Sequence, residues 1–99
     1  MATDRVHLVG TVSTDARAAI GPVLKGLVNG AVTETPDGFD VDGWQEGTDP
    51  RELNRQLLSA LRRVERRTRL RSEWTFDDVT YRFFDYALKG TRPASSDRP

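Results

Sequence analysis

The residues of this sequence best suited to chemistry are arginines that recur along one segment. Residues 55–71 contain seven arginines and a single acid, Glu65. A guanidinium group offers a rigid fork of hydrogen-bond donors that matches a phosphate or a carboxylate. At about 100° per residue of a helix, several of these side chains share one face, nearly opposite a stripe of leucines. We therefore predict a solvent-facing arginine ridge, whose candidate phosphate contacts are Arg55, Arg62, Arg66 and Arg69.

Acidic residues gather in the segment just before these arginines. Residues 34–52 contain seven acids and one base, Arg51, although the whole chain has 15 acids and 15 bases. Adjacent segments of opposite charge can steer a partner toward the protein, or they can pair with each other inside one monomer. The sequence leaves both alternatives open.

Aromatic residues form the second group of candidate contacts, and they are dense over the last predicted strands. In a fold with helices on one side of a sheet, aromatic side chains on the other side can make a stacking platform or a subunit interface. The alternative is that most of them belong to the core. The candidate contacts of this group are Trp74, Phe84 and Tyr86.

Composition argues against several functional classes. The chain has no cysteine and a single histidine, His7, so thiolate sites are excluded and no imidazole pair is available for a metal. No nucleophile motif or phosphate-binding glycine loop is present, and we predict a protein that is not an enzyme, without metal or cofactor. No window approaches 18 consecutive apolar residues, and the N-terminus lacks an apolar signal region, so we expect no membrane contact and a cytoplasmic location.

Secondary structure follows from the period of the apolar residues. Strands are expected at residues 6–12, 31–35, 39–44, 70–76 and 79–88, and a first helix at residues 16–28. A hairpin turn is expected at Pro36-Asp37-Gly38, and Asp77-Asp78 should turn the chain again. Asp49 followed by Pro50 and Glu52 forms a capping box, which predicts a second helix of about 20 residues.

This order of elements predicts a single α+β domain over residues 1–90, with a disordered tail at 91–99. Two helices packed on one face of an antiparallel sheet would give the order β-α-β-β-α-β-β, a ferredoxin-like fold with an added edge strand. The alternative merges the first hairpin into one bent strand and gives β-α-β-α-β-β. An apolar phase shift near Phe83-Phe84 indicates a β-bulge, or a strand that is apolar on both faces.

The first strand, Val6-His7-Leu8-Val9-Gly10-Thr11, resembles the first RNA-contacting strand motif of RNA-recognition-motif domains, with His7 at the stacking position. The resemblance covers these six residues and would imply RNA binding on the sheet. The second motif of that family is absent, because Asp40 and Asp42 stand in the strand that should be basic and aromatic.

Two functions remain after these exclusions. The first is a non-enzymatic interaction module that binds a protein partner or a second copy of itself through an aromatic sheet face and a charge-segregated surface. The second is a nucleic-acid-binding protein that contacts phosphates through the arginine ridge. A net charge of zero favours the first, because nucleic-acid-binding domains are usually basic.

Overall fold

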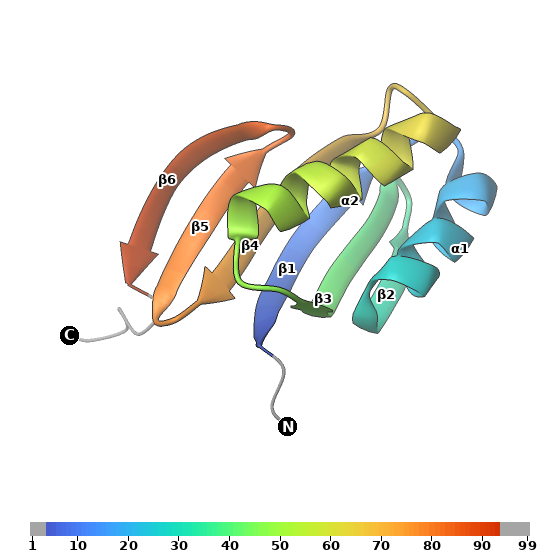
Figure 1. The fold of residues 1–99 in the computed structure, drawn as a ribbon. Coiled ribbons are helices and arrows are strands. Elements are labelled where there is room, and N and C mark those ends of the chain that lie inside the picture. The colour runs from blue at the N-terminus through green and yellow to red at the C-terminus, as the bar shows by residue number, and fades with distance from the viewer. Residues whose placement is uncertain (1–3, 94–99) are drawn as a thin grey trace.

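The computed structural model describes residues 4–93 and has an α+β fold (Figure 1). Six strands and two helices make it up. In chain order they are β1 (Arg5–Ser13), α1 (Arg17–Leu27), β2 (Asn29–Thr35), β3 (Gly38–Glu46), α2 (Pro50–Val64), β4 (Arg69–Phe76), β5 (Val79–Phe84) and β6 (Ala87–Pro93). Neither helix in this part of the chain is long and apolar enough to cross a membrane.

All six strands form one sheet in the order β2-β3-β1-β4-β5-β6, and each neighbouring pair is antiparallel. Both helices lie on the same side of this sheet and contact each other, α1 over β2 and β3 and α2 over β4 (Figure 1). The β5–β6 hairpin extends beyond the helices at one edge (Figure 1). Among residues 4–93, no helix lies on the opposite face of the sheet.

The core lies between the helices and the sheet. Side chains of alternate strand residues point into it, and the leucine stripe of α2 covers them, as its three- and four-residue spacing predicts. Its largest fully buried side chain is that of Trp74, followed by Leu8, Ile20, Leu24, Leu57, Leu58, Leu61 and Leu70. In β3, Phe39, Val41 and Gly43 are buried on the core face, whereas Asp40, Asp42 and Trp44 are exposed on the opposite face.

The start of α2 confirms the predicted N-cap Asp49 and Pro50, whereas the Glu52 carboxylate, the other half of the predicted capping box, accepts hydrogen bonds from Arg55 and Gln56 instead. The carboxylate of Asp49 accepts hydrogen bonds from the backbone N–H groups of Arg51, at 3.0 Å, and Glu52, at 3.4 Å. Pro50 occupies the first helical turn, where its missing N–H leaves no intrahelical hydrogen bond unmade.

Both predicted turns are also present. The β2–β3 connection runs through Pro36 and Asp37. Because β2 and β3 are two separate strands, the alternative with one bent strand is wrong. The β4–β5 connection is Asp77-Asp78, with φ angles of 56° and 68°. Positive φ at both central residues is the geometry that matches the twist of two antiparallel strands.

The prediction of one strand at residues 79–88 is wrong, because these residues belong to two strands, β5 and β6, and to the turn between them. A two-residue turn at Asp85-Tyr86 separates β5 from β6, with φ of 54° at Asp85. The order is therefore β-α-β-β-α-β-β-β. The register of this pair also shifts between Arg82 and Phe83, where the sequence pattern indicates a bulge.

The predicted tail at residues 91–99 falls partly inside the sheet. Thr91, Arg92 and Pro93 belong to β6 and pair with β5, because Tyr81, Thr80 and Val79 supply their strand partners. Residues 94–99 lie outside the described residues.

Candidate interaction surface

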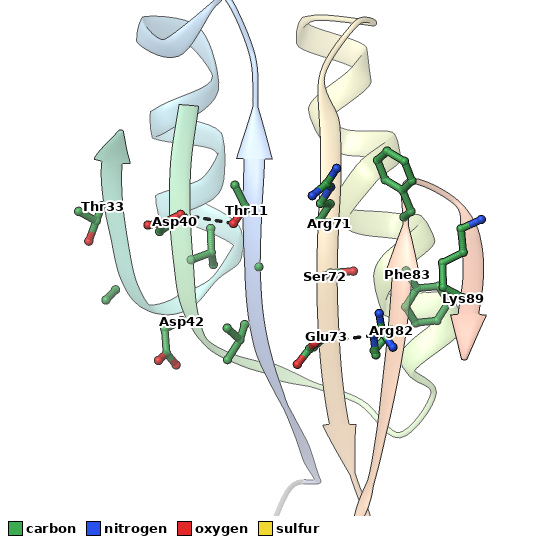
Figure 2. A pocket seen from close by; sticks show the side chains of 15 residues that line it. Thr11, Thr33, Asp40, Asp42, Arg71, Ser72, Glu73, Arg82, Phe83 and Lys89 are labelled. Atoms are coloured by element: carbon green, nitrogen blue, oxygen red, sulfur yellow. Dashed lines mark hydrogen bonds and ion pairs between the residues drawn. The ribbon is translucent and has the colours of Figure 1, made fainter. Parts of the chain in front are cut away.

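The helix-free face of the sheet is hollowed into an open groove of about 770 Å³ (Figure 2). Side chains from all six strands line it, because every second residue of a strand points to this face. The strand registers place some of these residues side by side in a single row across the sheet. In order from β2 to β5, the row is Ala31, Asp42, Val9, Glu73 and Arg82.

One side of the groove is acidic. Asp40 and Asp42 project from β3 and lie apart from the basic residues, on the other side of β1 (Figure 2). The Asp42 carboxylate lies 2.8 Å from Nε2 of His7, and the Asp40 carboxylate accepts a hydrogen bond from Thr11 at 3.4 Å. Both acids are exposed, so each keeps oxygen atoms available to a partner.

The other side of the groove is basic. Arg71, Arg82 and Lys89 project from β4, β5 and β6 respectively (Figure 2). Glu73 lies among them, with its carboxylate 3.8 Å from Nε of Arg82 and 2.8 Å from Nη2 of Arg92. The groove therefore holds three acids and three bases that are sorted by strand: two of the acids on β3, and all three bases on β4 to β6.

Apolar side chains lie between and beside these charges. Val9, in the middle of the groove, has 44% of its surface exposed, and Trp44, on the same face of β3, has 40% exposed. Trp44 packs against His7 and lies under the guanidinium of Arg5, 5.1 Å from the ring centre. Since the core is already closed on the other side of the sheet, these exposed apolar groups contribute little to folding.

The predicted arginine ridge is wrong as a continuous surface, because α2 is shorter than predicted. Its C-cap is Glu65, so Arg66 lies in the following turn and Arg69 is the first residue of β4. The chain must become extended at Arg69 because that residue pairs with Ser13 of β1. Pairing with a strand distant in sequence thus overrides the local helical pattern.

The two candidate phosphate contacts of the ridge that lie on α2, Arg55 and Arg62, already have partners. Arg55 donates hydrogen bonds to Glu52 one turn earlier, which lowers the pKa of the glutamate and raises that of the arginine. Arg62 donates to the backbone oxygen of Thr68 at 2.9 Å and lies 3.3 Å from the carboxylate of Asp85. Within residues 4–93, Glu52 is the one acid of segment 34–52 that forms an ion pair with an arginine of α2, and no acid of the β2–β3 hairpin does.

Trp74 does not lie on the open face, and its prediction as a surface contact is wrong. Its side chain is 0% exposed and points toward the helices, in phase with Leu70 and Ser72. The indole N–H donates to the side-chain oxygens of Asn54 and Ser72, at 3.1 Å in each case. Substitution of Trp74 would therefore test the core and not an interface.

Phe84 and Tyr86, the other predicted aromatic contacts, lie at different places. Phe84 lines the groove, where the guanidinium groups of Arg71 and Arg69 lie 5.1 and 5.7 Å from its ring centre. Tyr86, 49% exposed, lies outside the groove in the β5–β6 turn, with Arg62 5.3 Å from its ring centre. Of the seven predicted contacts, only Phe84 lines the groove.

The basic side of the groove was missed from the sequence. Arg71 and Glu73 alternate with the buried residues of β4, and Arg82 lies opposite Glu73 on β5. This alternation was readable, and it assigns these charges to one face of the sheet. The alternation does not indicate which face the helices cover. Arg71 and Arg82 therefore could not be distinguished from the arginines of the helix as residues of an open sheet face.

The fold and the groove define a class of small α+β domain that has one covered and one open sheet face. Comparison of the chain with protein-family models, with curated proteins and with solved structures gives no match. Among the described residues, no group of three or more histidine, aspartate or glutamate side chains is arranged to hold a metal ion.

Proposed function

We propose that this protein is a small non-enzymatic interaction module that binds another polypeptide through the open face of its sheet. The observation that carries the proposal is a groove that combines the exposed side chain of Val9 with sorted charges, on the sheet face that also exposes Trp44. Apolar contact would provide the buried area, and complementary charge would select the partner and its orientation.

We also propose that the fold is ferredoxin-like and extended at one edge. Support comes from the order β2-β3-β1-β4 within the sheet, and from the two helices, which connect β1 to β2 and β3 to β4 on the same face. The β5–β6 hairpin would be the extension, two strands where the sequence predicts one. This extension supplies Arg82 and Lys89, and with them much of the basic side of the groove.

A photo-reactive amino acid placed on each face of the protein tests the proposed function. Thr11 lines the groove, whereas Arg63 is exposed on α2 on the opposite side of the molecule. After irradiation in an extract of the source cells, we expect protein adducts with the probe at position 11 and few with the probe at 63. Adducts of equal yield from both positions, or none from position 11, would contradict the proposal.

Nucleic-acid binding is a second candidate, on a changed set of residues. Arg63, Arg66 and Arg67 are exposed around the end of α2, and no carboxylate of residues 4–93 forms an ion pair with them. The predicted set of Arg55, Arg62, Arg66 and Arg69 cannot act together, because Arg55 and Arg62 are engaged within the fold. The support for nucleic-acid binding is therefore weaker than the sequence suggests.

Anisotropy of labelled oligonucleotides at about 50 and about 200 mM salt tests this candidate directly. Binding that is lost at the higher salt, and lost in Arg66→Glu/Arg67→Glu, would favour it. In the cross-linking experiment, the same function would give adducts that nuclease removes. Absence of binding at the lower salt would exclude it.

A further inference from the structure

We infer that the occupant of the open sheet face is a second copy of this chain, related by a two-fold axis that runs parallel to the strands between β1 and β4. The inference rests on the proposed function, since it requires that this face binds a polypeptide. It adds the identity of the partner and the pairs of residues that meet.

The symmetry of the sheet gives the reason for this axis. The order β2-β3-β1-β4-β5-β6 has its midpoint between β1 and β4. A two-fold axis along the strands at this midpoint places β3 of one copy over β5 of the other, and it keeps each residue at its own height along the strands. Two sheets packed face to face keep their strands within about 30° of each other, as this arrangement requires.

One row of the sheet then becomes complementary to itself. From β3 to β5 the row reads Asp42, Val9, Glu73 and Arg82. Reversal of this order by the two-fold axis places Asp42 of each copy opposite Arg82 of the other, so that the pair forms twice. Val9 of each copy meets the aliphatic part of Glu73 of the other copy, because these two residues lie on either side of the axis.

Other placements of the two copies oppose like charges. A two-fold axis perpendicular to the strands would leave β3 over β3, with the acids of one copy facing those of the other. An axis along β1 would place β3 over β4, and Asp42 would face Glu73 of the second copy. Like charges held opposite each other at an interface are unfavourable. The charge pattern therefore selects the axis between β1 and β4.

The size of the face fits a reversible dimer. Six strands spaced about 4.8 Å apart, each about seven residues long, give a face of about 24 by 23 Å. Contact between two such faces would bury about 1,100 Å² in total, near the lower limit for a specific interface. We therefore expect association in the micromolar range that weakens as salt screens the ion pairs.

Sedimentation velocity on the full chain, from about 1 to about 500 μM and at about 50 and about 500 mM salt, measures this association. Asp42→Arg and Arg82→Asp should each weaken the dimer about tenfold or more, because each opposes two like charges. An equimolar mixture of these two variants should restore association, since both ion pairs re-form between unlike chains. The double variant Asp42→Arg/Arg82→Asp should also dimerise, and Arg63→Glu on the far side should dimerise like the unchanged protein.

The outcomes separate this inference from the proposed function. A chain that stays monomeric at every concentration overturns self-association, while groove-specific adducts with a different protein would still support the interaction module. Dimers of unchanged affinity in both single variants place the interface elsewhere and overturn the inference. Failure of the mixture and of the double variant to associate would overturn the two-fold arrangement. Far-ultraviolet circular dichroism of each variant confirms that it is folded.

Discussion

Removal of the Asn54 side chain should strongly destabilise the protein, because this residue joins α2 to β4 and to the β5–β6 turn. Asn54 is 1% exposed. Its oxygen accepts hydrogen bonds from the hydroxyl of Ser72 at 2.6 Å and from the indole of Trp74 at 3.1 Å. Its amide donates to the backbone oxygen of Asp85 at 2.9 Å, in the β5–β6 turn.

The magnitude follows from the groups that lose a partner in Asn54→Ala. The Trp74 indole keeps its bond to Ser72, but the Ser72 hydroxyl and the Asp85 oxygen each lose the amide. A buried polar group without a partner costs about 1–3 kcal/mol, and a part-buried one costs less. We expect a loss of about 2–3 kcal/mol in the free energy of unfolding, which lowers Tm by roughly 10–20 °C in a domain of this size.

Urea unfolding followed by circular dichroism measures this change, with two comparison variants. Asn54→Leu fills most of the space without replacing the hydrogen bonds and should remain destabilised by about 1.5 kcal/mol or more. Arg63→Ala, at an exposed position of the same helix, should change stability by less than about 0.5 kcal/mol. An Asn54→Leu protein as stable as the unchanged one would refute the argument from hydrogen bonding, since only packing would then matter.

Two further predictions concern the β1–β3 contact and the start of α2. Gly38→Ala places a Cβ atom against the backbone oxygen of Val12, so the strands must separate, and urea unfolding should show a loss of about 2 kcal/mol or more. In the matched change Gly26→Ala, the added Cβ atom meets no atom of residues 4–93 within 4 Å outside its own helix, so this change should stabilise α1 by about 0.5–1 kcal/mol. Equal effects of the two changes would contradict the reasoning. The hydrogen bond from Arg55 lowers the pKa of Glu52 below 4.5, so the folded state binds fewer protons than the unfolded chain. The resulting stabilisation of the folded state is complete above pH 4.5 and is lost as the pH falls further. Glu52→Gln should therefore reduce the difference between the free energies of unfolding at pH 6 and at acidic pH. Urea unfolding at both pH values measures this difference, and an unchanged difference in the variant would argue against the reasoning.

Features set by neighbouring residues could be predicted from the sequence. The Asp49-Pro50 start of α2, the Pro36-Asp37 turn and the Asp77-Asp78 turn depend on hydrogen bonds and φ preferences within four residues. The alternation of Asp40 and Asp42 with buried residues fixed their common face. These contacts are local, so they need no knowledge of the rest of the fold.

Features that depend on distant strands could not be predicted. The helical pattern continues past Val64, but pairing of Arg69 with Ser13 requires extended backbone and ends the helix. The apolar run across Phe83-Phe84 does not mark the turn at Asp85, whose carboxylate accepts a hydrogen bond from the backbone N–H of Leu70 at 2.9 Å. Each of these interactions joins residues that are 15 or more positions apart.

The sequence alone determined that this chain would form an α+β domain with alternating faces and separated charges. The tertiary structure alone decided which face the helices cover, and with it the role of each aromatic residue. A strand pattern is identical whichever side is buried, and only the packing of α1 and α2 against one side distinguishes them. That choice buried Trp74 in the core and left Phe84 on the basic side of the groove, beside Arg71.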